Sequence, residues 1–159
     1  MKHKTVLSRV FRKRPEEDGN AALEFALVCP FLLVLLMGMV EFSRVLYNQQ
    51  VITNAARDSS RASATGYEPY IEAANRILEP AHIPSPTPSC TTSPSAGQTS
   101  ICRTKPTIDV DGATTYAHQV AISYNIQYIT PLGSLLELIA GNSSWGDGVT
   151  ITSTAVMRE

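Results

Sequence analysis

The sequence is poor in the side chains with which most enzymes carry out chemistry. It holds three histidines and three cysteines in 159 residues. His3, His82 and His118 stand far apart, and none has a cysteine or a carboxylate at a metal-ligand spacing. A phosphate-binding glycine loop, a nucleophile elbow and a pair of catalytic carboxylates are also missing from the sequence. We therefore expect a protein that is not an enzyme, with no catalytic residue, metal, cofactor or small-molecule substrate.

Charge is scarce and unevenly distributed. Charged residues make up 17% of the chain, and the formal net charge of -1 gives no argument for a nucleic-acid partner. Six of the thirteen Lys and Arg residues lie in the first fourteen positions, whereas the chain from Asn20 onward has seven basic and eleven acidic residues. A basic head before an acidic body is typical of a membrane protein whose N-terminus stays in the cytoplasm.

One long run, Ala21 to Val40, contains Glu24 as its only charged residue. Twenty helical residues rise about 30 Å, which is the thickness of the hydrocarbon core of a bilayer. Pro30 is tolerated in such a helix. The alternative is a cleaved signal peptide, whose shorter apolar core is followed closely by a small-x-small site; here the Ala62-Ser63-Ala64 triplet comes too late. The run therefore predicts one membrane-spanning helix, with lipid as a partner.

The helical pattern continues beyond the membrane span. Apolar and long side chains recur at a 3.6-residue spacing, and neither Pro nor Gly interrupts the chain between Val40 and Gly66. This predicts a single helix of about 45 residues that begins near Ala21, transmembrane first and amphipathic afterwards. Its apolar stripe needs a cover, either the chain's own domain or neighbouring copies. The predicted stripe consists of Phe42, Val45, Leu46, Gln49, Ile52 and Ala56.

The remaining chain predicts a small exported domain. We divide the sequence into a basic cytoplasmic leader (1–19), the long helix (20–66), a short helix with a Pro/Ser/Thr-rich loop (67–106) and an antiparallel sheet (107–159). The short helix is expected over Pro69 to Glu79, and residues 80–106 are expected to be a surface loop. The fold class is α+β, with the long helix packed on the sheet.

Three segments carry the strand pattern. Thr107 to Val110 is a short strand before an Asp111-Gly112 turn, AHQVAISYNIQY alternates apolar and polar residues, and Val149 to Met157 forms the last strand. Pro131 to Ala140 is either a short helix or an apolar loop.

Two cysteines flank the proline-rich loop. Cys90 and Cys102 either form a disulfide in an oxidising compartment or remain free thiols. Cys29 lies in the membrane span, where it serves as a small apolar side chain.

A short motif stands at the entrance of the apolar run. Gly19 is followed by Asn20, and Glu24 is the fifth residue after the glycine. A charged side chain in a membrane helix costs about 2.5–3.5 kcal/mol on insertion scales, so it is usually kept for a function. The arrangement resembles the processing site of type IV pilin-like precursors, which are cut after glycine on the cytoplasmic side. Cutting would remove the basic leader and leave an ammonium on Asn20 as a counter-charge for Glu24. The alternative is an unprocessed anchor in which Glu24 reaches the interface.

The stretch GNAALEFALVCPFLLVLLMGMVEFSRVLYNQQVITNAARDSSRASATG resembles the TadE-like pseudopilins of the tight-adherence (Flp, type IVc) pilus system. The resemblance covers residues 19–66 closely, and the ending TSTAVMRE is also similar. It implies a minor pilin-like subunit of a bacterial inner membrane, with its C-terminal domain periplasmic or extracellular, that acts in pilus assembly, adhesion and biofilm formation. The implied partners are a prepilin peptidase, other pilin-like subunits and the pilus assembly platform.

The same resemblance assigns roles to individual residues. Gly19 and Asn20 would flank the cut, and Glu24 would be the assembly glutamate. A helix surface for assembly would comprise Glu41, Arg44, Tyr47, Asn54, Arg57 and Arg61. The alternative for this surface is a solvated or domain-facing one with local pairs such as Glu41–Arg44. The alternative for the whole protein is a permanently anchored, unprocessed assembly factor with an exported interaction domain.

Overall fold

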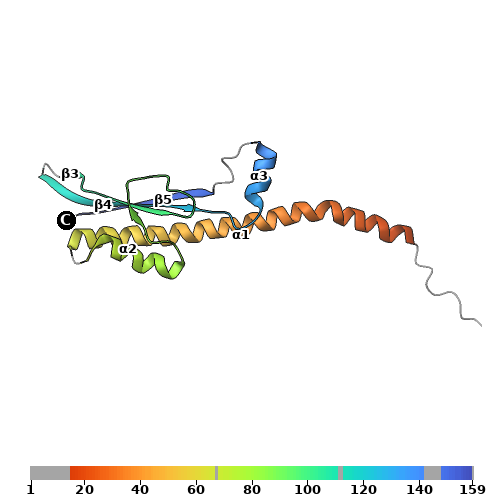
Figure 1. Ribbon diagram of the computed structural model, residues 1–159, viewed down its shortest axis with the longest axis horizontal. Helices are drawn as coiled ribbons and strands as arrows, with labels where there is room; N and C mark the ends of the chain where they lie inside the picture. The colour runs from red at the N-terminus through yellow and green to blue at the C-terminus, as the bar shows by residue number, and fades with distance from the viewer. Residues whose placement is uncertain (1–14, 67, 111–112, 142–147, 159) are drawn as a thin grey trace, which may run out of the picture. The chain divides into compact units, whose positions relative to one another are not determined.

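The computed structural model describes residues 15–66, 68–110, 113–141 and 148–158. The chain divides into two compact units, Met1–Leu36 and Met37–Glu159. A long helix, α1 (Pro15–Thr65), belongs to both units (Figure 1). The second unit also holds the sheet and the remaining helices, so the predicted α+β fold with a long N-terminal helix is confirmed.

Helix α1 begins six residues earlier than Ala21, where the sequence places its start. Pro15 occupies its first position, where the missing N–H group costs nothing because that group has no partner inside a helix. The helix continues through Pro30 and ends where expected. Gly66 follows with a φ of 65°, and its N–H donates to the carbonyl of Ala62 at 2.9 Å. A glycine in this left-handed conformation is a common helix stop.

The other elements lie in the second unit. Helix α2 (Tyr70–Leu78) is followed by the 3₁₀ turn η1 (Glu79–Ala81), and helix α3 (Leu132–Ala140) precedes the last strand. The strands are β1 (Thr87–Pro88), β2 (Thr99–Thr104), β3 (Thr107–Val110), β4 (Ala113–Ile126) and β5 (Val149–Arg158).

Strand β4 is the centre of the sheet. It pairs antiparallel with β2 and β3 in one continuous register, in which Ile101 faces Ile122, and antiparallel with β5 over ten register pairs. The carbonyl of Pro106 accepts the N–H of Ala117 at 3.0 Å and so keeps the register between β2 and β3. Strand β1 pairs with β2 in parallel, so the sheet is mixed and not purely antiparallel.

Two sequence-based expectations change in this region. The loop predicted for 80–106 is wrong over Thr99–Thr104, which form β2 with Ile101 fully buried. The six residues are short and flanked by proline-rich segments, so local composition hides a strand that pairing with β4 stabilises. Residues 131–140, for which helix and loop were both open, form α3. The expected turn at 111–112 lies outside the described residues.

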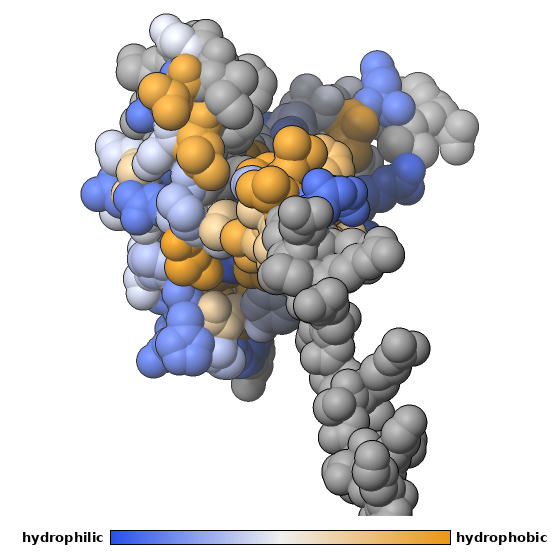
Figure 2. Space-filling view, turned by 90° about the vertical axis from the view of Figure 1, so that its right-hand side faces the viewer, coloured by the Kyte–Doolittle hydropathy of each residue, from blue (hydrophilic) through white to orange (hydrophobic). Residues whose placement is uncertain are grey.

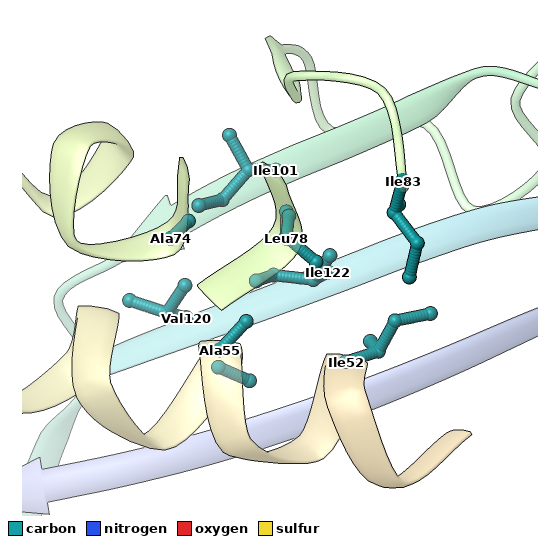
Figure 3. Packing of buried hydrophobic residues seen from close by; sticks show 9 residues of the cluster. Ile52, Ala55, Ala74, Leu78, Ile83, Ile101, Val120 and Ile122 are labelled. Carbon is teal, nitrogen blue, oxygen red and sulfur yellow. The ribbon is translucent and has the colours of Figure 1, made fainter. Parts of the chain in front are cut away.

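Helices α1 and α2 cover one face of the sheet (Figure 3). Their buried side chains meet those of the central strands in one cluster. Its members are Ile52, Ala55 and Ala56 of α1, Ala74 and Leu78 of α2, Ile83, Ile101 of β2, and Val120 and Ile122 of β4. The amphipathic part of α1 therefore covers the sheet, as the sequence predicts.

The face of α1 that packs on the sheet is rotated from the predicted stripe. Ile52 and Ala56 are buried as expected, but Phe42 is 64% exposed and Leu46 is 45% exposed. Glu41 and Asn48 are buried in their place. A pattern of apolar residues does not predict a buried face that includes Glu41, whose partners Ile129 and Thr130 come from the segment after β4.

Replacing Ile122 by Ala should destabilise the protein because the side chain is completely buried in this cluster. The expected loss in free energy of unfolding is about 2–5 kcal/mol. Denaturant unfolding of the full chain in detergent, followed by circular dichroism, measures it. Val156→Ala is the control: this side chain is 55% exposed, and its truncation should change stability by no more than about 0.5 kcal/mol. An equal effect of the two variants would contradict the assigned core.

Candidate functional site

The predicted processing motif lies in the first part of α1. Gly19 and Asn20 are both helical residues, so the bond between them lies in helical backbone. The side-chain amide of Asn20 donates to Oε1 of Glu24 at 3.3 Å, and both side chains are exposed. Residues four apart lie on the same side of a helix. Glu24 therefore stands on the side of the helix that carries the side chain of Asn20.

The apolar run after this motif exposes nearly all of its side chains. Every residue from Ala21 to Leu36 is exposed except the half-buried Cys29. Hydrophobic side chains are visible as orange patches in Figure 2. Among the described residues, one helix, Asn20–Thr65, is long and apolar enough to cross a membrane. This exposure is compatible with a single-pass membrane protein, since contiguous apolar surface of this extent needs a cover.

Glu41 is the first residue after the apolar run, and it connects α1 to the segment that follows β4. Its side chain is only 4% exposed. Oε1 accepts the N–H groups of Ile129 and Thr130, each at 2.7 Å. Oε2 lies 3.2 Å from Nη1 of Arg44, and the same nitrogen donates to the carbonyl of Gln127 at 3.1 Å. We call these five residues the Glu41 clasp.

The clasp favours the charged carboxylate. Burial by itself raises the pKa of Glu41, but the hydrogen bonds from Thr130 and Ile129 and the charge of Arg44 outweigh it. The pKa of Glu41 therefore lies below its ordinary value of 4.5. The structure thus places Glu41 and Arg44 in contacts within the chain, and a role for them between subunits stays a prediction.

The predicted helix surface contains four further residues. Tyr47, Asn54, Arg57 and Arg61 are exposed, and Tyr47, Asn54 and Arg61 follow one another at intervals of seven. Arg57 and Arg61 line a groove of about 580 Å³ together with Ile77 of α2. These residues stand on the free side of α1, where a neighbouring subunit could reach them.

Arg76 of α2 stands at the same groove. It binds Asp58 at 2.8 Å and Glu68 at 2.7 Å, so it ties α2 to α1 and to the turn between them. The sequence patterns do not predict this connection. Arg76 is 18 residues from Asp58 and 8 residues from Glu68, and not at the three- or four-residue spacing of neighbours on one helix.

Cys90 and Cys102 form a disulfide in the structure, with their Cα atoms 4.6 Å apart. Cys102 is on β2, so the bond fastens the segment after β1 to the sheet. The Ser100 hydroxyl donates to the carbonyl of Thr91 at 2.6 Å in the same place. The disulfide holds a proline-rich segment that local sequence alone would leave as an open loop.

A polar cluster around the buried His118 lies near the C-terminal end of α1. Nδ1 of His118 is 2.9 Å from the Ser63 hydroxyl, which also accepts a hydrogen bond from Arg103 at 3.4 Å. The Arg103 guanidinium lies 5.1 Å from the ring centroid of Tyr70. His118 is 2% exposed, in agreement with a structural role. Among the described residues, no group of three His, Cys, Asp or Glu side chains could hold a metal ion.

Glu41→Gln should lower the free energy of unfolding by about 1–3 kcal/mol, because a buried charged acceptor is lost. The lowered pKa of Glu41 also has a pH consequence. Its contribution is fully present above 4.5 and is lost as pH falls through the lower folded value. The variant should therefore lose less stability than the wild type on acidification below 4.5, as measured by thermal unfolding at a series of pH values. Glu72→Gln, at an exposed position of α2, is the control; the same pH dependence in wild type and Glu41→Gln would contradict the clasp.

A comparison with known proteins gives a match over the segment that contains Gly19, Glu24 and two clasp residues, Glu41 and Arg44. No curated protein and no solved structure matches the chain. Residues 19–61 match the family model described as TadE-like protein. The match begins at Gly19 and ends at Arg61, so it covers the processing motif, the apolar run and the exposed surface of α1. The resemblance found in the sequence is thereby confirmed, and the chain carries a TadE-like segment over residues 19–61.

Proposed function

We propose that the chain is a minor pilin-like subunit of a tight-adherence pilus, matured by a prepilin peptidase that cuts between Gly19 and Asn20. The observation that carries the proposal is the position of Gly19, Asn20 and Glu24 at the head of an exposed apolar helix, inside the TadE-like match. The similarity to TadE-like proteins connects the chain to tight-adherence pilus systems. The protein would lie in the bacterial inner membrane with its N-terminus in the cytoplasm, and its domain would be exported.

Cutting changes the electrostatics at Glu24. In the cut chain the helix begins at Asn20, so the new ammonium and the first unpaired N–H groups of the helix lie about one turn from the Glu24 carboxylate. Opposite charges attract strongly where water is excluded. The mature helix end would carry a charge pair, and a neighbouring subunit could exchange partners with it to fix the axial register.

The helical start at Pro15 has a consequence for the peptidase. A protease binds an extended backbone, so the turn around Gly19 must open before the cut. Glycine costs a helix about 1 kcal/mol relative to alanine, and helix ends fray. Gly19 therefore weakens the helix where it has to open.

The exposed side of α1 supports assembly with other subunits. Phe42, Leu46 and Tyr47 remain exposed after the domain has packed, and they continue the apolar surface beyond the span. A helix from a neighbouring pilin-like subunit would cover them and gain the free energy of apolar burial. Such a role is structural and not enzymatic, as expected of a pilus assembly family. The second candidate, an unprocessed anchored factor, would keep the leader and use only the exported domain.

The intact mass of the protein purified from its native membrane distinguishes the two candidates. We expect a mature chain that begins at Asn20, and a full-length chain for Gly19→Arg because the side chain cannot enter the peptidase site. Asp18→Arg is the matched control, since it adds the same side chain one residue earlier and should still be cut. A full-length wild-type chain, in cells that process their major pilin normally, would contradict the proposal in favour of a fixed anchor.

Glu24→Gln separates processing from assembly. The variant should still be cut after Gly19, because the glycine and the leader are unchanged. Its recovery with sheared pili or in cross-links with other pilin-like subunits should fall at least about tenfold, the equivalent of about 1.4 kcal/mol of lost pairing. Gln50→Glu, at an exposed position of α1, is the control for a changed charge on the helix. Normal recovery of Glu24→Gln would remove the assembly role of this residue.

A further inference from the structure

Helix α3 and the residues just before it expose two apolar side chains, Leu138 and Ile129, that the proposed function does not use. Its sequence, LGSLLELIA, holds five Leu or Ile residues and a single charge. Leu138 is 81% exposed, and Ile129, just before the helix, is 67% exposed. In the apolar run of α1, Leu27 is 80% exposed and Phe31 is 68% exposed, which are similar values. The side chains are thus as open as those that would face lipid.

The Glu41 clasp determines how far this apolar surface lies from the end of the apolar run of α1. Ile129 and Thr130 are bonded to Glu41 at 2.7 Å, and Glu41 directly follows Val40, the last residue of the apolar run. One residue of helix rises about 1.5 Å, whereas the headgroup layer on each side of the hydrocarbon core is about 5–8 Å thick. A chain segment tied to Glu41 therefore lies at headgroup level when α1 spans the bilayer.

The direction of α3 agrees with this position. Helix α3 and the part of α1 that begins at Met37 lie in the same compact unit. Within that unit α3 runs across the axis of α1 and not along it (Figure 1). A helix that crosses this part of α1, directly beyond the apolar run, can lie along a membrane surface.

We propose that α3 is an interfacial helix, with Ile129 and Leu138 inserted at the boundary between headgroups and acyl chains. Such helices bind through apolar area, and basic residues add attraction to anionic lipid. Helix α3 contains no Lys or Arg, so the lipid surface it fits is a neutral one and its insertion should not depend on salt. The inference rests on the proposed membrane span of α1. It adds a second point of membrane contact, which limits how the exported domain can tilt.

Brominated lipid tests the position of Leu138 directly. Trp145 is the only tryptophan, so Trp145→Phe gives a silent background for single-tryptophan variants. The full chain is placed in phosphatidylcholine nanodiscs with brominated or ordinary acyl chains. We expect bromine to quench the Leu138→Trp variant to on the order of half the extent seen for Phe31→Trp in the span, at low and at high salt. Val156→Trp, at an exposed position of β5, should not be quenched.

The control variants distinguish a failure of the interfacial-helix proposal from a failure of the proposed membrane span of α1. Quenching of Phe31→Trp without quenching of Leu138→Trp beyond the Val156→Trp level would overturn the interfacial helix and leave the span intact. A blue-shifted but unquenched Leu138→Trp signal would also overturn it, because protein would then cover α3. Absence of quenching in Phe31→Trp would overturn the span and this inference together. Ile129→Trp repeats the measurement if circular dichroism shows that Leu138→Trp is misfolded.

Discussion

Helix α1 combines an exposed apolar run with a face that packs on the sheet, and the rest of the structure depends on this combination. From Ala21 to Val40 the side chains of α1 other than Glu24 are apolar, and they are exposed on nearly every side, which suits lipid. From Glu41 onward one side is buried against the sheet, with Ile52 and Ala55 completely enclosed. The change takes place within a single turn and without a break in the helix. The domain that contains the sheet therefore has to be fastened to α1 directly beyond the apolar run.

The Glu41 clasp provides that fastening. It places a charged carboxylate at a buried position, where an apolar residue would be expected. A buried carboxylate is costly unless it is paired and hydrogen-bonded. Here two N–H groups and one guanidinium meet it, and they come from the segment that follows β4 and from the next turn of α1. The clasp joins the end of the central strand to the start of the domain-facing helix. It also sets the position of α3, whose exposed Leu138 we assign to the membrane interface.

Features that follow from a strong local pattern are predicted correctly from the sequence. Features that depend on pairing between distant segments are not. Alternation predicts a strand in the region of β4, and Gly66 predicts the end of α1, because each signal is complete within a few residues. Strand β2 was missed because only its register with β4 makes Thr99–Thr104 a strand. The buried face of α1 was misplaced because the partners of Glu41 lie more than eighty residues away. At the candidate site, Gly19, Asn20 and Glu24 are recognisable from spacing alone, whereas the contacts of Arg76 are visible only in the fold.

A spin-label accessibility scan along α1 tests this account of the helix most directly. Single cysteines on the Cys29→Ser background would carry labels at exposed positions from Phe31 to Gln50, with the full chain in a bilayer. The account predicts accessibility to oxygen through Val40 and accessibility to a water-soluble nickel complex from Phe42 onward, with the change at Glu41. A change several turns away from Glu41, or access of the nickel complex along the apolar run, would contradict it.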